Sequence, residues 1–117
     1  MKVRNVTKNT IIAGEAVVAD SFLSRMVGLL DRRNLKEGEA LIITRCRSIH
    51  MFFMKFSIDA IFVDNKDVVV GTVENIRPFC LSPFFWKASY VIELPAGVIM
   101  KSRTSLGDIV KVHAGSV

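Results

Sequence analysis

The close spacing of turn signals constrains this chain most, because Gly, Pro, Asn and Asp clusters recur about every eight to twelve residues. Between them lie short stretches of alternating or wholly apolar residues, which are typical of β-strands. Strands are predicted at residues 2–7, 11–19 (a hairpin or strand pair), 40–43, 48–54, 58–63, 68–73, 89–94 and 109–113. This pattern predicts a mostly β fold, a compact sandwich or barrel of about eight short strands.

Two segments interrupt this β pattern with helical signals. Asp20 and Ser21 are N-cap residues, and apolar residues follow at helical spacing as far as Leu30. We predict one α-helix over residues 21–30, packed on one side of the β structure. A single helical turn is predicted at 98–102. Gly71, inside a predicted strand, indicates a β-bulge.

Length and composition indicate one domain. The chain has 117 residues, of which 50% are hydrophobic and 23% are charged. These values predict a single globular domain over residues 1–117. No apolar run approaches the roughly 18 residues of a membrane-spanning helix, and no apolar signal core follows the first residues. We therefore predict a cytoplasmic protein without a membrane partner.

The net charge of +5 is concentrated in the first half of the chain. Residues 1–58 contain ten Lys and Arg against five Asp and Glu, whereas residues 59–117 contain six of each kind. Such asymmetry attracts anionic ligands or nucleic acid. Because the cations alternate with acids, we expect a mildly positive solvated surface and do not expect nucleic acid as the main partner.

Asp59 lies inside the most apolar segment of the chain, on a strand face shared with Ile61. A buried, unpaired carboxylate costs several kcal/mol, so Asp59 must be paired, hydrogen-bonded or open to a pocket. Candidate partners are Lys55, Arg47, His50 and the backbone N–H groups of residues 55–58. Asp59 is therefore either a structural clamp on that corner or an acid, base or ligand acceptor at a pocket mouth.

Glu93 is the second carboxylate in an apolar strand. If its strand pairs near that of Asp59, the two carboxylates and Lys55 could converge at one end of the sandwich. Such a group performs acid–base chemistry or binds a polyol or a cation. The alternative is an exposed strand residue before a turn.

The segment 79–88 follows Pro78, contains Pro83 and is rich in large apolar side chains. It is either a lid folded over an open end of the sandwich or an exposed aromatic patch for a ligand or partner. In both cases Trp86 and Lys87 could line a pocket mouth.

Cysteines and histidines are too few and too widely spaced for a metal site. Cys46 and His50 lie roughly 13 Å apart in an extended strand, and C-x-x-C spacing is absent. Phosphate-loop, dinucleotide and G-x-S-x-G motifs are absent too. We predict no metal and no cofactor.

Several motifs occur in the order found in one known family. They are Gly28-Leu29-Leu30, the run from Ser48 to Asp64, Glu93-Leu94-Pro95-Ala96-Gly97 and Gly107-Asp108. The chain resembles the domain-of-unknown-function family 192 over nearly its whole length, although Ser57 replaces the proline usual before the Ile-Asp pair. The resemblance implies a jelly-roll-like β fold found in bacteria and archaea. It implies no reaction or ligand.

Three functions fit these observations. The first is a binding module for a small polar or anionic ligand at one end of the sandwich, with Lys55, Asp59, Glu93, Trp86 and His50 as site residues. The second is a protein- or nucleic-acid-interaction protein that uses the aromatic loop 79–87 and the basic first half. The third is a cofactor-independent hydrolase that uses Asp59 and Glu93. The sequence leaves enzymatic activity and oligomeric state open.

Overall fold

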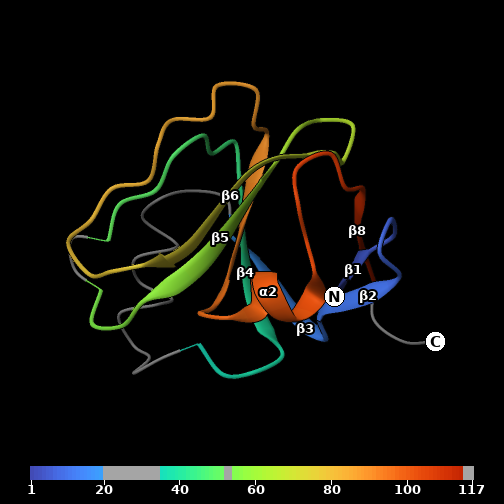
Figure 1. The fold of residues 1–117 in the computed structure, drawn as a ribbon, viewed down its shortest axis with the longest axis horizontal. Helices are drawn as coiled ribbons and strands as arrows, with labels where there is room; N and C mark the ends of the chain where they lie inside the picture. Colours follow the sequence, from blue (N-terminus) through green and yellow to red (C-terminus); the bar gives the residue numbers. More distant parts are fainter. Residues whose placement is uncertain (20–34, 52–53, 115–117) are drawn as a thin grey trace.

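A computed structural model describes residues 1–19, 35–51 and 54–114, which contain eight strands and one short helix (Figure 1). The strands are β1 (Lys2–Asn5), β2 (Thr10–Ala13), β3 (Glu15–Ala19), β4 (Glu39–Thr44), β5 (Ile58–Val63), β6 (Val69–Ile76), β7 (Tyr90–Pro95) and β8 (Val110–His113). The helix is α2 (Val98–Ser102). The mostly β prediction is confirmed, whereas the finer jelly-roll description stays a prediction.

The strands form two sheets. The smaller sheet has the order β2-β1-β8, and the larger has the order β3-β4-β7-β5-β6. In the larger sheet β3 and β4 run parallel, and the remaining pairs are antiparallel. The most apolar strand, β5, therefore lies between β7 and β6, away from the sheet edges.

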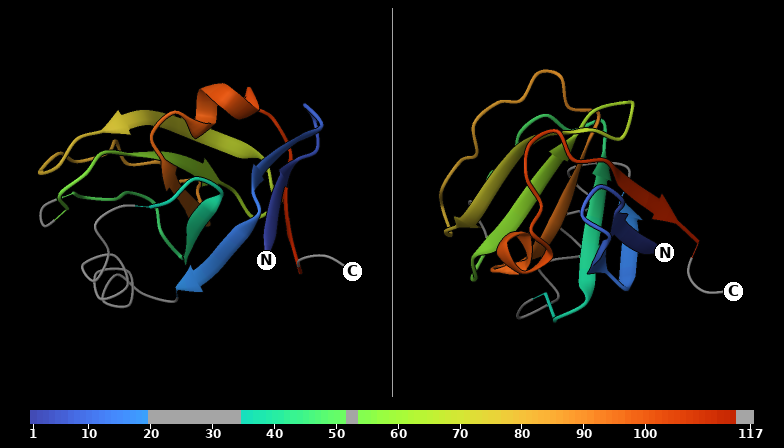
Figure 2. Two further views of the ribbon diagram at one scale, coloured as in Figure 1. Left: turned by 90° about the horizontal axis from the view of Figure 1, so that it is seen from below. Right: turned by 45° about the vertical axis from the view of Figure 1, so that its right-hand side comes forward.

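The larger sheet is buried on both faces, as expected for apolar strands without polar alternation. On one face, Ile61 and Ile92 belong to a core completed by the smaller sheet and by α2. Figure 2 shows α2 beside the smaller sheet, and the helix contacts both β2 and β5. On the other face, Ala60 and Phe62 belong to a second core that irregular segments of the chain complete.

The predicted strand at 48–54 is wrong for the residues that the structure describes. Residues 48–51 and Met54 are irregular, with one isolated bridge between His50 and Leu81. Ile49, Met51 and Met54 are nevertheless buried in the core. The apolar pattern thus reported burial correctly, but a run that is apolar on both sides does not by itself specify a strand.

Other local predictions have clear outcomes. The helical turn at 98–102 is confirmed as α2. The bulge at Gly71 is confirmed, because Phe62 pairs with Gly71 while the next residue of β5, Val63, pairs with Val69. The helix predicted at 21–30 lies outside the described residues.

Gly71 also makes room for an aromatic anchor. A Cβ atom at this position would overlap the ring of Phe85. That ring packs on Phe62, with 4.5 Å between the ring centroids. The segment 79–89 is therefore fastened to the sheet where β6 has no side chain.

A polar cluster joins β1 to the segment before β8. Asp108 Oδ2 accepts hydrogen bonds from Asn5 Nδ2 (2.9 Å), Lys8 Nζ (2.8 Å) and the backbone N–H of Ser105 (3.0 Å). Burial opposes ionisation of Asp108, but the hydrogen bonds from Asn5, Lys8 and Ser105 and the charge of Lys8 outweigh it. Together they lower the pKa of Asp108 to about 2.

We expect Gly71→Ala to lower the free energy of unfolding by about 1–3 kcal/mol, because the new methyl group displaces the Phe85 ring. Gly14→Ala is the matched control, since a Cβ there has no described atom within 4 Å. Urea denaturation of both variants measures the difference. Equal stabilities would show that Phe85 does not depend on the Gly71 gap.

Asp108 should also make stability depend on acid. A carboxyl with a lowered pKa stabilises the fold above its unfolded value of 3.8, and that contribution is lost as pH falls toward about 2. We expect Asp108→Asn to be about 1–3 kcal/mol less stable than the wild type at neutral pH. The difference in free energy of unfolding between the wild type and Asp108→Asn should narrow between about pH 4 and pH 2. A pH-independent gap in urea titrations would contradict this assignment.

Candidate functional site

Asp59 is fully buried in β5 and accepts three backbone hydrogen bonds. Its Oδ1 accepts one from the N–H of Asn75 at 2.8 Å. Its Oδ2 accepts from the N–H groups of Gly97 and Ile99, each at 3.0 Å. These contacts tie β5 to the end of β6 and to the start of α2.

Local backbone irregularities direct these N–H groups at the carboxylate. Ile58 pairs with Ile76 but Ala60 pairs with Val73, so β6 bulges opposite Asp59, and Asn75 there has a φ of 53°. Gly97 precedes α2 with a φ of 101°. The clamp interpretation fits these contacts. However, the carboxylate holds the β6 bulge and the α2 turn, where we had expected the 55–58 corner and the side chains of Lys55, Arg47 or His50.

Glu93 is also fully buried, but on the opposite face of the sheet. Glu93 pairs directly with Ala60, whereas Asp59 pairs with Leu94. Because directly paired residues share a face and successive residues alternate, the two carboxylates point to opposite sides. Lys55 is exposed before β5. The structure therefore pairs the two strands but does not bring the carboxylates together.

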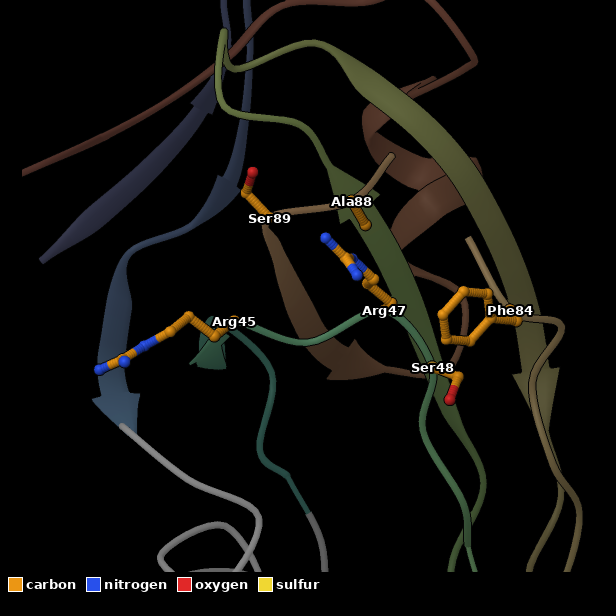
Figure 3. Close-up of a pocket in the computed structure, with 6 residues that line it drawn as sticks. All are labelled: Arg45, Arg47, Ser48, Phe84, Ala88 and Ser89. Atoms are coloured by element: carbon orange, nitrogen blue, oxygen red, sulfur yellow. The ribbon is translucent and has the colours of Figure 1, made fainter. Parts of the chain in front are cut away.

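A hollow of about 580 Å³ lies at the other end of the sheet (Figure 3). There β4 and β5 end and β7 begins, with Tyr90 paired to both Thr44 and Val63. Asp59 is four residues from Val63 along β5, roughly 13 Å in an extended strand. The lining residues are Arg45, Arg47, Ser48, Phe84, Ala88 and Ser89.

The side chain of Arg47 extends across this hollow. Figure 3 shows it directed toward Ala88 and Ser89, with the ring of Phe84 on one side. Arg45 points to the other side, toward β3. In the described part of the chain, Arg47 makes no ion pair. Its guanidinium is therefore available to an anion from solution.

Two neighbouring hollows extend the same surface. One of about 370 Å³ shares Arg47, Ala88 and Ser89 and adds Lys66 and Lys87. The other, of about 110 Å³, shares Arg45 and Ser48 with the main hollow and includes His50 and Cys46. We call the three together the basic end of the sheet.

One carboxylate, Asp64, also lines the basic end, and one of its two oxygens accepts hydrogen bonds from the turn after β5. Asp64 Oδ1 accepts hydrogen bonds from the N–H groups of Lys66 (2.8 Å) and Val68 (3.0 Å). The described lining thus combines four cationic side chains with one carboxylate. This balance favours an anion.

Two irregular segments support the basic end. They run side by side, with the N–H of Phe85 bonded to the carbonyl of Arg47 at 2.8 Å and that of Ser82 bonded to Ile49 at 2.9 Å. The N–H of Met51 is bonded to the carbonyl of Cys80 at 2.8 Å. The backbone of both segments is fixed by these bonds, which holds Arg47 and Phe84 next to each other.

The expected lid is only partly present in the aromatic segment. Phe85 packs inward, whereas Phe84 is 64% exposed and Trp86 is 68% exposed. Phe79 and Leu81 are exposed as well. Lys87 Nζ lies 5.8 Å from the ring centroid of Trp86, within cation–π range. Of the predicted site residues, Trp86 and His50 belong to the two segments that build the basic end.

Tyr90 is another titratable group near this end. Burial, followed by the hydrogen bond from its hydroxyl to Asp67 (2.9 Å), raises the pKa of Tyr90 far above its ordinary value. Tyr90 is therefore a neutral donor at physiological pH and does not serve as a base there.

Sequence reasoning did not select Arg45, Arg47 or Ser89 as site residues. It counted both arginines in the basic first half and considered Arg47 also as a partner of Asp59. A usable signal was present, because Arg45 and Arg47 directly follow a buried strand. Within the described ranges, no group of three His, Cys, Asp or Glu side chains could hold a metal ion. No helix among these residues is long and apolar enough to cross a membrane.

We expect Asp59→Asn to lower the free energy of unfolding by about 2–4 kcal/mol, because an amide accepts fewer hydrogen bonds than a carboxylate and its NH₂ group would face backbone donors. Glu74→Gln, an exposed acid-to-amide change on β6, is the control and should have almost no effect. Unchanged stability of Asp59→Asn in denaturant titration would exclude the clamp.

Comparisons with known proteins place the chain in a family. The family model DUF192, described as "Uncharacterized ACR", matches residues 3–112. A UPF0127 protein of Thermococcus sibiricus is 38% identical over 89% of this chain and 70% of its own length. A UPF0127 protein of Pyrococcus horikoshii is 37% identical over 92% of this chain and 95% of its own length. A crystal structure of a protein of unknown function from Novosphingobium aromaticivorans covers 95% of this chain and 82% of its own, with a TM-score of 0.79 and 20% identity, and shares the fold. The chain belongs to the DUF192 family, as the resemblance predicted.

Proposed function

We propose that this protein is a binding module for a small anionic ligand at the basic end of the sheet. The observation that supports it is the position of Arg47, whose guanidinium extends across a hollow of about 580 Å³. Guanidinium groups form short, charge-assisted hydrogen bonds with phosphate and carboxylate groups. The hydroxyls of Ser48 and Ser89 on the lining add neutral donors.

The predicted site residues enter this proposal in different ways. His50 lines the smallest hollow, and Trp86 lies beside Lys87, so both border the basic end. A ligand role for Lys55, Asp59 and Glu93 stays a prediction. The hydrolase alternative has less support, because Asp59 and Glu93 lie on opposite faces of the sheet.

A second candidate function is contact with a protein or nucleic acid through the aromatic segment. Its support is the exposure of four large apolar side chains, Phe79, Leu81, Phe84 and Trp86. Exposed apolar side chains close together in one segment are a feature of interaction sites. Phe84 belongs both to this segment and to the lining of the main hollow, so the two candidate functions share a residue. They do not exclude each other.

We expect Arg47→Ala to weaken the binding of pyrophosphate by about tenfold or more, because a charge-assisted hydrogen bond is lost. Isothermal titration calorimetry at low salt measures the affinity, since screening reduces it at high salt. Arg4→Ala is the control, because it removes an exposed arginine side chain from β1, in the other sheet. It should leave pyrophosphate binding nearly unchanged.

Unfolding midpoints of both variants should match the wild type, because both arginines are exposed. The proposal would be overturned by wild-type protein that does not bind pyrophosphate. It would equally be overturned by Arg47→Ala and Arg4→Ala binding alike.

A further inference from the structure

We infer that the ligand of the basic end carries a planar aromatic ring joined to a phosphate group. This inference rests on the proposed anion site and specifies the class of compound that it takes. The phosphate lies beside Arg47 and Ser89, and the ring stacks on Phe84. The juxtaposition of Arg47 and Phe84 on one hollow carries the inference.

The exposure of Phe84 is the first step of the argument. The ring of its neighbour Phe85 packs on Phe62 of the sheet. The segment therefore packs one of its two adjacent phenylalanine rings against the sheet and leaves the other, Phe84, exposed. Phe84 remains 64% exposed on the wall of the hollow. An exposed aromatic face is a stacking platform for planar groups.

The size of the hollow is the second step. Its volume of about 580 Å³ lies within the roughly 300–1,000 Å³ of pockets that hold drug-sized ligands. A single inorganic anion would fill a small part of this space. A ring joined to a phosphate extends from the arginine to the aromatic wall.

The charge of the lining is the third step and favours phosphate over carboxylate. Among the described residues of the basic end, Arg45 and Arg47 line the main hollow, and Lys66, Lys87 and the one carboxylate, Asp64, line the neighbouring hollow that shares Arg47. A phosphate monoester carries nearly two negative charges at neutral pH and three acceptor oxygens. A carboxylate carries one charge and two oxygens, so it matches fewer of these donors.

The test compares phenyl phosphate with glycerol 2-phosphate at about pH 8, where both are dianions because their second pKa is near 6. The fluorescence of Trp86, the single tryptophan, and calorimetry measure both affinities. We expect the wild type to bind phenyl phosphate about tenfold more tightly, the range expected for stacking on one aromatic side chain. Phe84→Leu should remove this preference while glycerol 2-phosphate binding stays the same.

Phe79→Leu is the matched control, since Phe79 is a similarly exposed phenylalanine of the same segment that is not part of the lining. It should retain the preference for phenyl phosphate. Equal affinity of the wild type for the two phosphates would overturn the ring inference and leave the proposed anion site intact. Loss of the preference in Phe79→Leu but not in Phe84→Leu would overturn it as well. Failure of the wild type to bind either phosphate or pyrophosphate would overturn both proposals.

Discussion

The carboxylate of Asp59 is the interaction on which one end of this protein depends. It connects β5, which lies between β7 and β6, to the bulged end of β6 and to the first turn of α2. Asn75 and Gly97 both have left-handed backbone conformations, so their N–H groups cannot join a regular ladder. N–H groups that leave a regular ladder beside a buried strand need another acceptor, and a carboxylate supplies four lone-pair sites at one point. An apolar strand therefore contains a charged residue because its neighbours leave regular structure there.

The two ends of the large sheet consequently have different properties. At the Asp59 end, the carboxylate accepts three hydrogen bonds from the backbone of the protein itself. At the basic end, the two irregular segments form hydrogen bonds with each other's backbone, for example from the N–H of Phe85 to the carbonyl of Arg47. The described arginine side chains there are exposed and are not needed to complete that backbone. Charge at one end thus serves the fold, and charge at the other is accessible to a ligand.

Much of the sheet could be predicted from the sequence, because alternation assigns each residue of β5 and β7 to the correct face. Alternation alone does not show whether Asp59 and Glu93 share a face, because that depends on the register between β5 and β7. The observed register differs by one residue from the register that would pair them. The basic end was harder to predict. Arg47 and Phe84 are far apart in sequence, and they meet through segments whose hydrogen bonds follow no periodic pattern.

The hydrogen-bonded backbone of the segment that contains Phe84 has an energetic consequence for binding. A ligand that must order a loop loses part of its interaction energy to conformational entropy. Here Phe85 occupies the space above Gly71 and packs on Phe62, so the sheet already holds the segment in place. The neighbouring residues Phe84 and Phe85 therefore have complementary roles: the ring of Phe85 packs on the sheet and holds the segment, while the exposed ring of Phe84 lines the same hollow as Arg47. Because the ring of Phe85 fills the space where Gly71 has no side chain, Gly71 contributes to the site as well as to the fold.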